Sequence, residues 1–202
     1  MTTRERLLID VNHEIETLRQ YLGTSGHHPE VGEFSEIMAP AKAYWTYPDV
    51  ISPAPHVFRI AGEQKIRDLV IYHHQLLFAS PLKDIFGDSE KRFEIIANRT
   101  ADFHVEACGG PKYYSSVRGS ASLGIRHLPF TITEADRELW LDLYAKSLVD
   151  TRFPLDAGEI YWRWIESVSL RVINRRGRAL PPERVSFNQA MSKARQFAEG
   201  AI

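Results

Sequence analysis

The chain has 202 residues, of which 44% are hydrophobic and 25% are charged, and its formal net charge is -1. These proportions are typical of a globular protein with a full core, and the near-zero charge excludes the basic field that attracts nucleic acid or anionic lipid. The single cysteine, Cys108, excludes an internal disulfide framework and any metal site built from several thiolates.

The first 60 residues combine one predicted helix with a proline-rich segment. Residues 4–22 place leucine, isoleucine and valine side chains on one stripe, which Gly23 ends. Asp10 cuts the first apolar run too short for a signal peptide, and no later run reaches membrane-spanning length. Residues 39–58 hold prolines and aromatic residues, which is typical of an extended segment lying on a folded body. We therefore expect a cytoplasmic protein with an N-terminal extension over residues 1–60.

Two helices are predicted next. Apolar residues recur at spacings of three and four from Glu63 to Ala79, where Ser80-Pro81 ends the pattern and Pro81 can open a short helical turn through Phe86. The second helix runs from Lys91 to Cys108. Gly109-Gly110-Pro111 closes it, because glycine tolerates a positive φ and proline cannot continue the hydrogen-bond ladder.

The following segment is predicted to be a loose loop that leads into two further helices. Residues 112–132 contain only short helical pieces. Thr133 is a good N-cap for a helix from Glu134 to Asp150, because Asp136 stands three residues on. A last long helix is expected from Asp156 to Asn174.

The C-terminal tail is weakly amphipathic over residues 186–198, and we expect it to be peripheral. No repeat and almost no alternating strand pattern is present. The chain is therefore predicted to be all-α, with a compact domain over residues 61–175 and a C-terminal extension over residues 176–202.

One histidine, His127, sits among apolar residues behind the glycine-rich break and ahead of a helix that carries Trp140. This order can aim a single imidazole at a flat, apolar, metal-bearing group, which points to haem. A lone histidine in an apolar setting is more often an ordinary core or surface residue, so spacing alone leaves both interpretations open.

Over about residues 62–175 the order of motifs resembles the truncated haemoglobins of the second group. The resemblance is carried by Gly109-Gly110-Pro111, by Arg126-His127-Leu128-Pro129-Phe130-Thr131-Ile132 and by Arg137-Glu138-Leu139-Trp140-Leu141. Each motif alone is weak, whereas the combination is specific. It implies a truncated globin-like two-over-two helical sandwich that holds haem b, to which this chain adds an N-terminal helix.

The resemblance also implies roles for residues around the haem. His127 would be the proximal iron ligand, with its other ring nitrogen donating the hydrogen bond that fixes the tautomer. Arg126 and Arg99 would pair with the haem propionates, since a guanidinium binds a carboxylate bidentately, although both are also ordinary surface residue types. Tyr114 is a weaker hydroxyl partner. Phe86 would press on the haem face, while Phe103 and Phe130 fit either a haem wall or the core.

On the ligand side, Trp140 matches an indole whose N–H can donate to an iron-bound ligand. The chain departs from the family at His73-His74, where a tyrosine commonly stands. Spacing to Pro81 favours His74 as the ligand-facing residue and spacing to Phe86 favours His73. Adjacent helical residues diverge by about 100°, so we expect only one of them to face the pocket, where a ring N–H can donate to the ligand.

Two further possibilities remain at this position: neither histidine reaches the ligand, or one of them coordinates the iron directly. On the next helix Ile96 would act as a gate, and Thr100 can donate a weak hydrogen bond.

The resulting hypothesis is a haem protein that reversibly binds O2 or another small diatomic ligand. The alternatives are an enzyme for nitric oxide dioxygenation or peroxidase-like oxidation, and a haem-based sensor that signals through residues 1–60. No flavin or nicotinamide fingerprint is present, so sustained turnover would need an external reductase. The sequence leaves the oligomeric state open.

Overall fold

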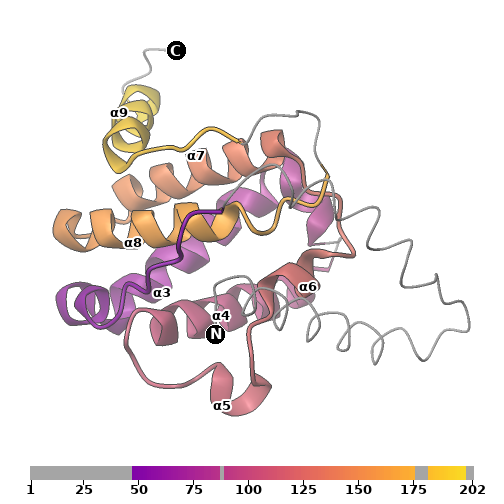
Figure 1. The fold of residues 1–202 in the computed structure, drawn as a ribbon, viewed down its shortest axis with the longest axis horizontal. Coiled ribbons are helices and arrows are strands. Elements are labelled where there is room, and N and C mark those ends of the chain that lie inside the picture. Colours follow the sequence, from indigo (N-terminus) through magenta and orange to yellow (C-terminus); the bar gives the residue numbers. More distant parts are fainter. Residues whose placement is uncertain (1–46, 87–88, 176–181, 199–202) are drawn as a thin grey trace, which may run out of the picture. The chain divides into compact units, whose positions relative to one another are not determined.

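A computed structural model of the chain describes residues 47–86, 89–175 and 182–198, which belong to one compact unit. The predicted helix over residues 4–22 and residues 39–46 of the proline-rich segment lie outside the described residues. Every regular element in the described part is a helix, which confirms the all-α prediction (Figure 1). None of the described helices is long and apolar enough to cross a bilayer.

The first described helix, α3, spans His56–Phe78 and contains one break. Gly62 has φ 75° and ψ 167°, so the regular part begins at Glu63 as predicted. The preceding turn corrects the expectation of extended chain through residue 58. The amides of Val57 and Arg59 donate to the carbonyls of Pro53 and Pro55 (3.3 and 3.2 Å). Proline suits this position, because it has no N–H that would need a partner at the start of a helix.

The predicted short turn after α3 is the 3₁₀ helix η1, Pro81–Ile85, which the Ser80 side chain caps. It leads to α4, Glu90–Ala107. Gly109 follows with φ 100°, which confirms the predicted helix stop. A Cβ at Gly110 would lie 2.5 Å from the Phe58 ring, so the pair of glycines also lets the end of α4 approach the start of α3 closely.

The loop after α4 contains the two short helices α5, Ser115–Arg118, and α6, Leu123–His127. The next helix, α7, spans Glu134–Asp150, and Thr133 and Asp136 form the predicted capping box. Helix α8 spans Leu155–Ser169 and therefore ends five residues before the predicted Asn174. The last helix, α9, spans Phe187–Ala198.

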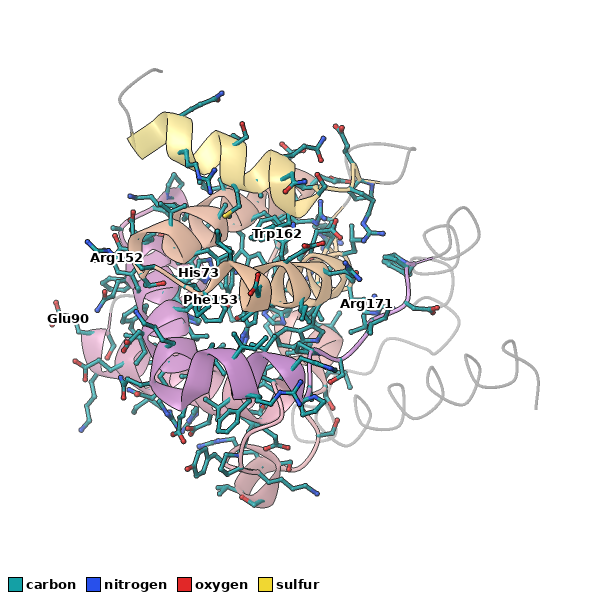
Figure 2. All side chains as sticks on the ribbon, turned by 90° about the vertical axis from the view of Figure 1, so that its left-hand side faces the viewer. His73, Glu90, Arg152, Phe153, Trp162 and Arg171 are labelled. Atoms are coloured by element: carbon teal, nitrogen blue, oxygen red, sulfur yellow. The ribbon has the colours of Figure 1, made fainter. Side chains whose placement is uncertain are left out.

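The helices pack as two pairs. Helix α3 contacts α4 on one side and both α7 and α8 on the other, and α7 and α8 lie side by side (Figure 1). This is the two-over-two arrangement that the resemblance implies. Helix α9 packs on α7 and buries Ala190, Met191 and Ala194, so it belongs to the core rather than to the periphery. Trp162 lies in the interior, and its indole N–H donates to the Val185 carbonyl just before α9 (2.7 Å; Figure 2).

A buried ion pair joins α7 to α8 and to the segment before α9. The Arg137 guanidinium lies 2.6 Å from Glu166 Oε1, and the two side chains are only 1% and 3% exposed. Arg137 also donates to Ser169 Oγ (2.8 Å) and to the carbonyl of Glu183 (3.0 Å). Arg184 closes the cluster from the solvent side, 2.6 Å from the other carboxylate oxygen. A buried charge costs several kcal/mol unless it is paired, so each member depends on the others.

Replacing Glu166 by alanine should therefore lower the free energy of unfolding by about 3–5 kcal/mol, because Arg137 is left buried without its counter-charge. Urea denaturation at neutral pH measures the loss. The matched control is Glu159→Ala on the same helix, whose partner Arg163 is exposed and whose loss should stay below about 1 kcal/mol. Equal losses in the two variants would show that the buried pair contributes no more to stability than the exposed pair.

Candidate functional site

His127 lies at the C-terminal end of α6, and one hydrogen bond fixes the state of its ring. Nδ1 stands 2.6 Å from the carbonyl oxygen of Leu123, one helical turn earlier. A carbonyl oxygen only accepts, so Nδ1 carries the proton and Nε2 keeps its lone pair in the neutral ring. Burial, with a smaller contribution from the Arg126 charge, lowers the pKa of His127, which favours that neutral ring. Nε2 has no hydrogen-bond partner among the described residues.

Asn174 holds the loop that follows His127. Its side chain donates to the carbonyls of His127 (3.0 Å) and Phe130 (2.7 Å) and accepts from the amide of Ile132 (2.9 Å). The backbone amide of Asn174 also donates to the Ile132 carbonyl (3.1 Å). These bonds require the chain to turn after Ser169, which explains why α8 ends before the predicted boundary. The segment just after α8 therefore positions the histidine loop.

The His74 side chain, on α3, lies beside two phenylalanines that follow this helix in the chain. Its ring is buried, and its centroid is 5.9 Å from that of Phe86 and 6.4 Å from that of Phe93. Nδ1 lies 2.8 Å from the carbonyl of Val70, so in the neutral ring Nδ1 again holds the proton and Nε2 the lone pair. Burial lowers the pKa of His74 to about 4. At neutral pH this ring therefore presents an acceptor at Nε2, where the sequence led us to expect a donor.

His73 is fully buried and turns toward α7, in the interior of the body (Figure 2). Its Nε2 donates to the backbone carbonyl of Trp140 (3.2 Å), and its ring lies 3.8 Å from that of Tyr144. Nδ1 is buried and without a hydrogen-bond partner in the described residues. Burial lowers the pKa of His73 well below its ordinary value, and the neighbouring His74 adds to the shift. The two histidines thus face different neighbours, as helical geometry predicts.

The remaining candidates on the ligand side are Trp140, Ile96 and Thr100. Trp140 is half-buried, packs edge-on against His73 (5.1 Å between centroids), and finds no acceptor for its indole N–H among the described residues. Ile96 and Thr100 are half-buried on α4. The Thr100 hydroxyl donates to the Ile96 carbonyl (3.0 Å), so its only proton is already engaged and the expected weak donor is not free.

The expected propionate partners fall into two groups. The Arg126 guanidinium lies over the Tyr114 ring, 5.9 Å from its centroid, and Nε donates to the Ala121 carbonyl (2.6 Å). Arg126 is exposed while Tyr114 is buried, so the charge remains open to solvent at the edge of the histidine loop. Arg99 is exposed on α4 and has no side-chain partner in the described residues. The structure brings Arg126 and Tyr114 together and leaves Arg99 on a separate helix.

Phe103 and Phe130 differ in their surroundings. Phe103 packs partly against the core and contacts the rings of Tyr114 (5.5 Å) and Trp164 (6.0 Å). Phe130 is half-buried, and its amide donates to the His127 carbonyl (3.1 Å). The contacts of Phe103 favour a place between core and site, and Phe130 belongs to the histidine loop.

The sequence alone did not predict one cluster of buried side chains. His104, on α4, lies against Tyr161 of α8 and Tyr144 of α7, and all three side chains are buried. A signal was present, because Phe93, Ala97, Ala101 and His104 recur at spacings of three and four, which is the stripe that α4 buries. The predicted pocket stripe of this helix instead ran through Ile96 and Thr100, which are half-buried.

The side chains around His127 suit a haem better than a bare metal ion. Among the described residues no group of three or more histidine, cysteine, aspartate or glutamate side chains could hold a metal. One neutral imidazole with a free lone pair is sufficient only for a metal that a porphyrin already coordinates. Beside His127, the half-buried Phe130 and the solvent-facing Arg126 fit the apolar face and the carboxylate edge of such a group.

Asn174→Ala should lower the free energy of unfolding by about 3 kcal/mol, because three hydrogen bonds to the histidine loop are lost. Urea denaturation measures the change. Asn98→Ala is the matched control, since that exposed side chain makes a single bond within its own helix and should change stability by less than about 0.5 kcal/mol. A similar, small effect in both variants would remove Asn174 as the anchor of the loop.

Comparisons with known proteins agree with this fold. The bacterial-like globin family matches residues 58–174, which is more than half of the chain. A solved structure of phosphate-bound Hell's gate globin IV is 41% identical, superposes with a TM-score of 0.70, and covers 73% of this chain and 92% of its own. The group II truncated haemoglobin of Bacillus anthracis is 26% identical with a TM-score of 0.53, over 65% of this chain and 97% of its own.

A curated relative, group 2 truncated hemoglobin 3-1 of Lotus japonicus, is 36% identical over 72 residues. That stretch is 36% of this chain and spans 41% of the Lotus protein. The two-over-two fold, the extent of the family match and the identity to Hell's gate globin IV lead to one conclusion. The chain belongs to the bacterial-like globin family, which implies a haem cofactor.

Proposed function

We propose that this globin binds haem b through Nε2 of His127 and uses it to bind O2 or another small diatomic ligand reversibly. The observation that carries the proposal is the bond from His127 Nδ1 to the Leu123 carbonyl, which leaves a neutral ring with its lone pair free. When bound, haem would supply an iron at which a small ligand can bind. The protein supplies orientation, an apolar enclosure and hydrogen-bonding groups.

Each group of side chains around the haem then has a task. Arg126, with Tyr114 beside it, is suited to hold a propionate at the solvent edge, and Arg99 is a second candidate from α4. Phe86, Phe103 and Phe130 would form apolar walls, and Ile96 would narrow the access to the ligand. These assignments follow from the family resemblance and agree with the exposure of the arginines and the partial burial of the aromatic side chains.

Of the two candidate groups facing the ligand, Trp140 is the better donor at neutral pH. Its indole N–H has no acceptor among the described residues, whereas Nε2 of neutral His74 has a lone pair and no proton. His74 becomes a donor only when its ring is doubly protonated, and its pKa of about 4 places that change well below neutrality. His74 would therefore bias the pocket toward acceptor chemistry.

Removing the proximal imidazole tests the haem site. His127→Gly should lose the Soret band of the purified wild-type protein, and added imidazole should restore it, because the free base can fill the space of the deleted ring. Absorption spectra with and without imidazole measure this. His56→Gly, which removes an exposed histidine, is the control and should keep the wild-type spectrum. An unaltered spectrum in His127→Gly would contradict the proposed ligand.

The ligand side is tested by stopped-flow measurement of O2 dissociation. Trp140→Phe removes the N–H and keeps a ring, and should speed O2 release about fivefold, the equivalent of roughly 1 kcal/mol.

In the wild type, O2 release should slow as the pH falls toward about 4, since protonation of His74 converts Nε2 into a donor. His74→Leu should abolish this pH dependence. Faster release from His74→Leu already at neutral pH would instead make His74 the donor.

A second candidate function is peroxidase-like reduction of hydrogen peroxide, which the Nε2 lone pair of His74 favours. An acceptor in that position can take a proton from a peroxide O–H group, as a general base. The reducing electrons would come from an external reductant or reductase. Peroxide consumption with an added electron donor should fall at least about tenfold in His74→Leu. An undiminished rate in that variant would dismiss this function for His74.

A further inference from the structure

A buried chain of hydroxyl and imidazole groups crosses the core between α4, α7 and α8. The hydroxyls of Tyr144 and Tyr161 lie 2.6 Å apart, and the Tyr161 hydroxyl lies 2.5 Å from Nδ1 of His104. Tyr161 is fully buried, and Tyr144 and His104 are 1% and 4% exposed. None of these groups takes part in the haem contacts proposed above, so their close pairing has another consequence.

The direction of this chain follows from counting protons. Two hydroxyl protons must be placed, and the Tyr144 hydroxyl meets only Tyr161 and, at 3.4 Å, His104 Nδ1 among the described residues. If Nδ1 were protonated, one hydroxyl proton would lack an acceptor in the interior, which is costly. With Nδ1 as the acceptor, Tyr161 donates to His104 and Tyr144 donates to Tyr161, so both protons are satisfied. Burial keeps the imidazole neutral, since it lowers the pKa of His104 to about 3.

Aromatic rings connect this pair to the ligand side of the site. The Trp140 and Tyr144 rings lie 4.7 Å apart between centroids, and the Tyr144 and Tyr161 rings lie 5.8 Å apart. Trp140 is the indole proposed to face the ligand. Rings in contact provide a continuous route for an electron between the haem pocket and Tyr161.

A phenol that loses an electron becomes a strong acid and must also lose its proton, so a base in hydrogen-bond contact decides which ring is oxidised. Tyr161 has such a base, because it donates to an imidazole nitrogen. Tyr144 donates only to another hydroxyl, which is a poor base, and the Trp140 indole N–H has no acceptor among the described residues. Burial raises the pKa of the Tyr161 hydroxyl, so an oxidation through the phenolate is disfavoured.

We propose that Tyr161 is a redox-active residue, which reduces a peroxide-oxidised haem by one electron while its phenolic proton moves to Nδ1 of His104. The Tyr161 O–H bond breaks, an N–H bond forms, and a neutral tyrosyl radical remains beside an imidazolium. Hydrogen peroxide is the oxidant: its O–O bond breaks, and with two protons and two electrons it becomes two molecules of water. Tyr161 supplies one of those electrons by way of Tyr144 and Trp140, and an external one-electron donor supplies the other.

The radical is then quenched by a further electron from that reductant, and the proton returns from His104. This inference rests on the proposed haem site. It assigns to the core of the protein a store for one oxidising equivalent that is shielded from solvent.

The test is electron paramagnetic resonance of the haem-loaded protein, frozen shortly after mixing with hydrogen peroxide. Incorporation of ring-deuterated tyrosine should narrow the radical signal, and Tyr161→Phe should abolish it. Tyr72→Phe is the matched control, because that hydroxyl binds Asp150 and its ring makes no contact with the Trp140–Tyr144–Tyr161 series in the described residues. His104→Gln keeps a hydrogen-bond acceptor but no base, and should lower the radical yield and shift its high-field g value.

The Soret band, recorded on each sample before and after peroxide, separates the two levels of the proposal. A Soret band that changes with peroxide, together with a tyrosyl signal that survives in Tyr161→Phe, overturns the inference and leaves the haem site standing. A signal that tyrosine deuteration does not narrow does the same. Absence of a Soret band in the wild type overturns the haem site, and the role of Tyr161 falls with it.

Discussion

Backbone carbonyl oxygens determine what the histidines of this globin can do. Because a carbonyl can only accept, the bonds from His127 to Leu123 and from His74 to Val70 assign the proton of each neutral ring to Nδ1 and leave the lone pair at Nε2. In His73 the proton lies on the other ring nitrogen, because Nε2 donates to the Trp140 carbonyl. Burial keeps these rings neutral, so each lone pair remains available. The proposed iron ligand and the acceptor character of the ligand side follow from this constraint.

The fold keeps the His127 loop in place through contacts that are far apart in the sequence. Asn174, just beyond α8, binds the two carbonyls and the amide that surround the loop. The buried pair of Arg137 and Glu166 fixes α7 against α8, and Arg184 ties the segment before α9 to the same cluster. The helix after the globin core is thereby connected to the helix that carries Trp140, although the sequence suggested a peripheral tail.

Local signals in the sequence were sufficient to predict the helices and to identify the motif around His127. The capping box at Thr133 and the glycine stop after Cys108 depend on residues close together, and both predictions are confirmed. The predicted end of α8 was wrong by five residues, because the hydrogen bonds of Asn174 to a distant loop override the apolar periodicity. Spacing alone could not decide between His73 and His74, since the orientation and tautomer of each ring depend on carbonyls that only the fold brings near. The pairing of His104 with Tyr161 is likewise a contact between two helices, made by residues that lie 57 positions apart in the sequence.

The most direct measurement of the central claim is a crystal structure of the haem-loaded protein. It should show iron bound to Nε2 of His127 with the bond from Nδ1 to the Leu123 carbonyl preserved, and Nδ1 of His74 still paired with the Val70 carbonyl. Iron bound to a different side chain, or a His127 ring turned so that Nδ1 meets the metal, would contradict the view that this carbonyl prepares the proximal ligand.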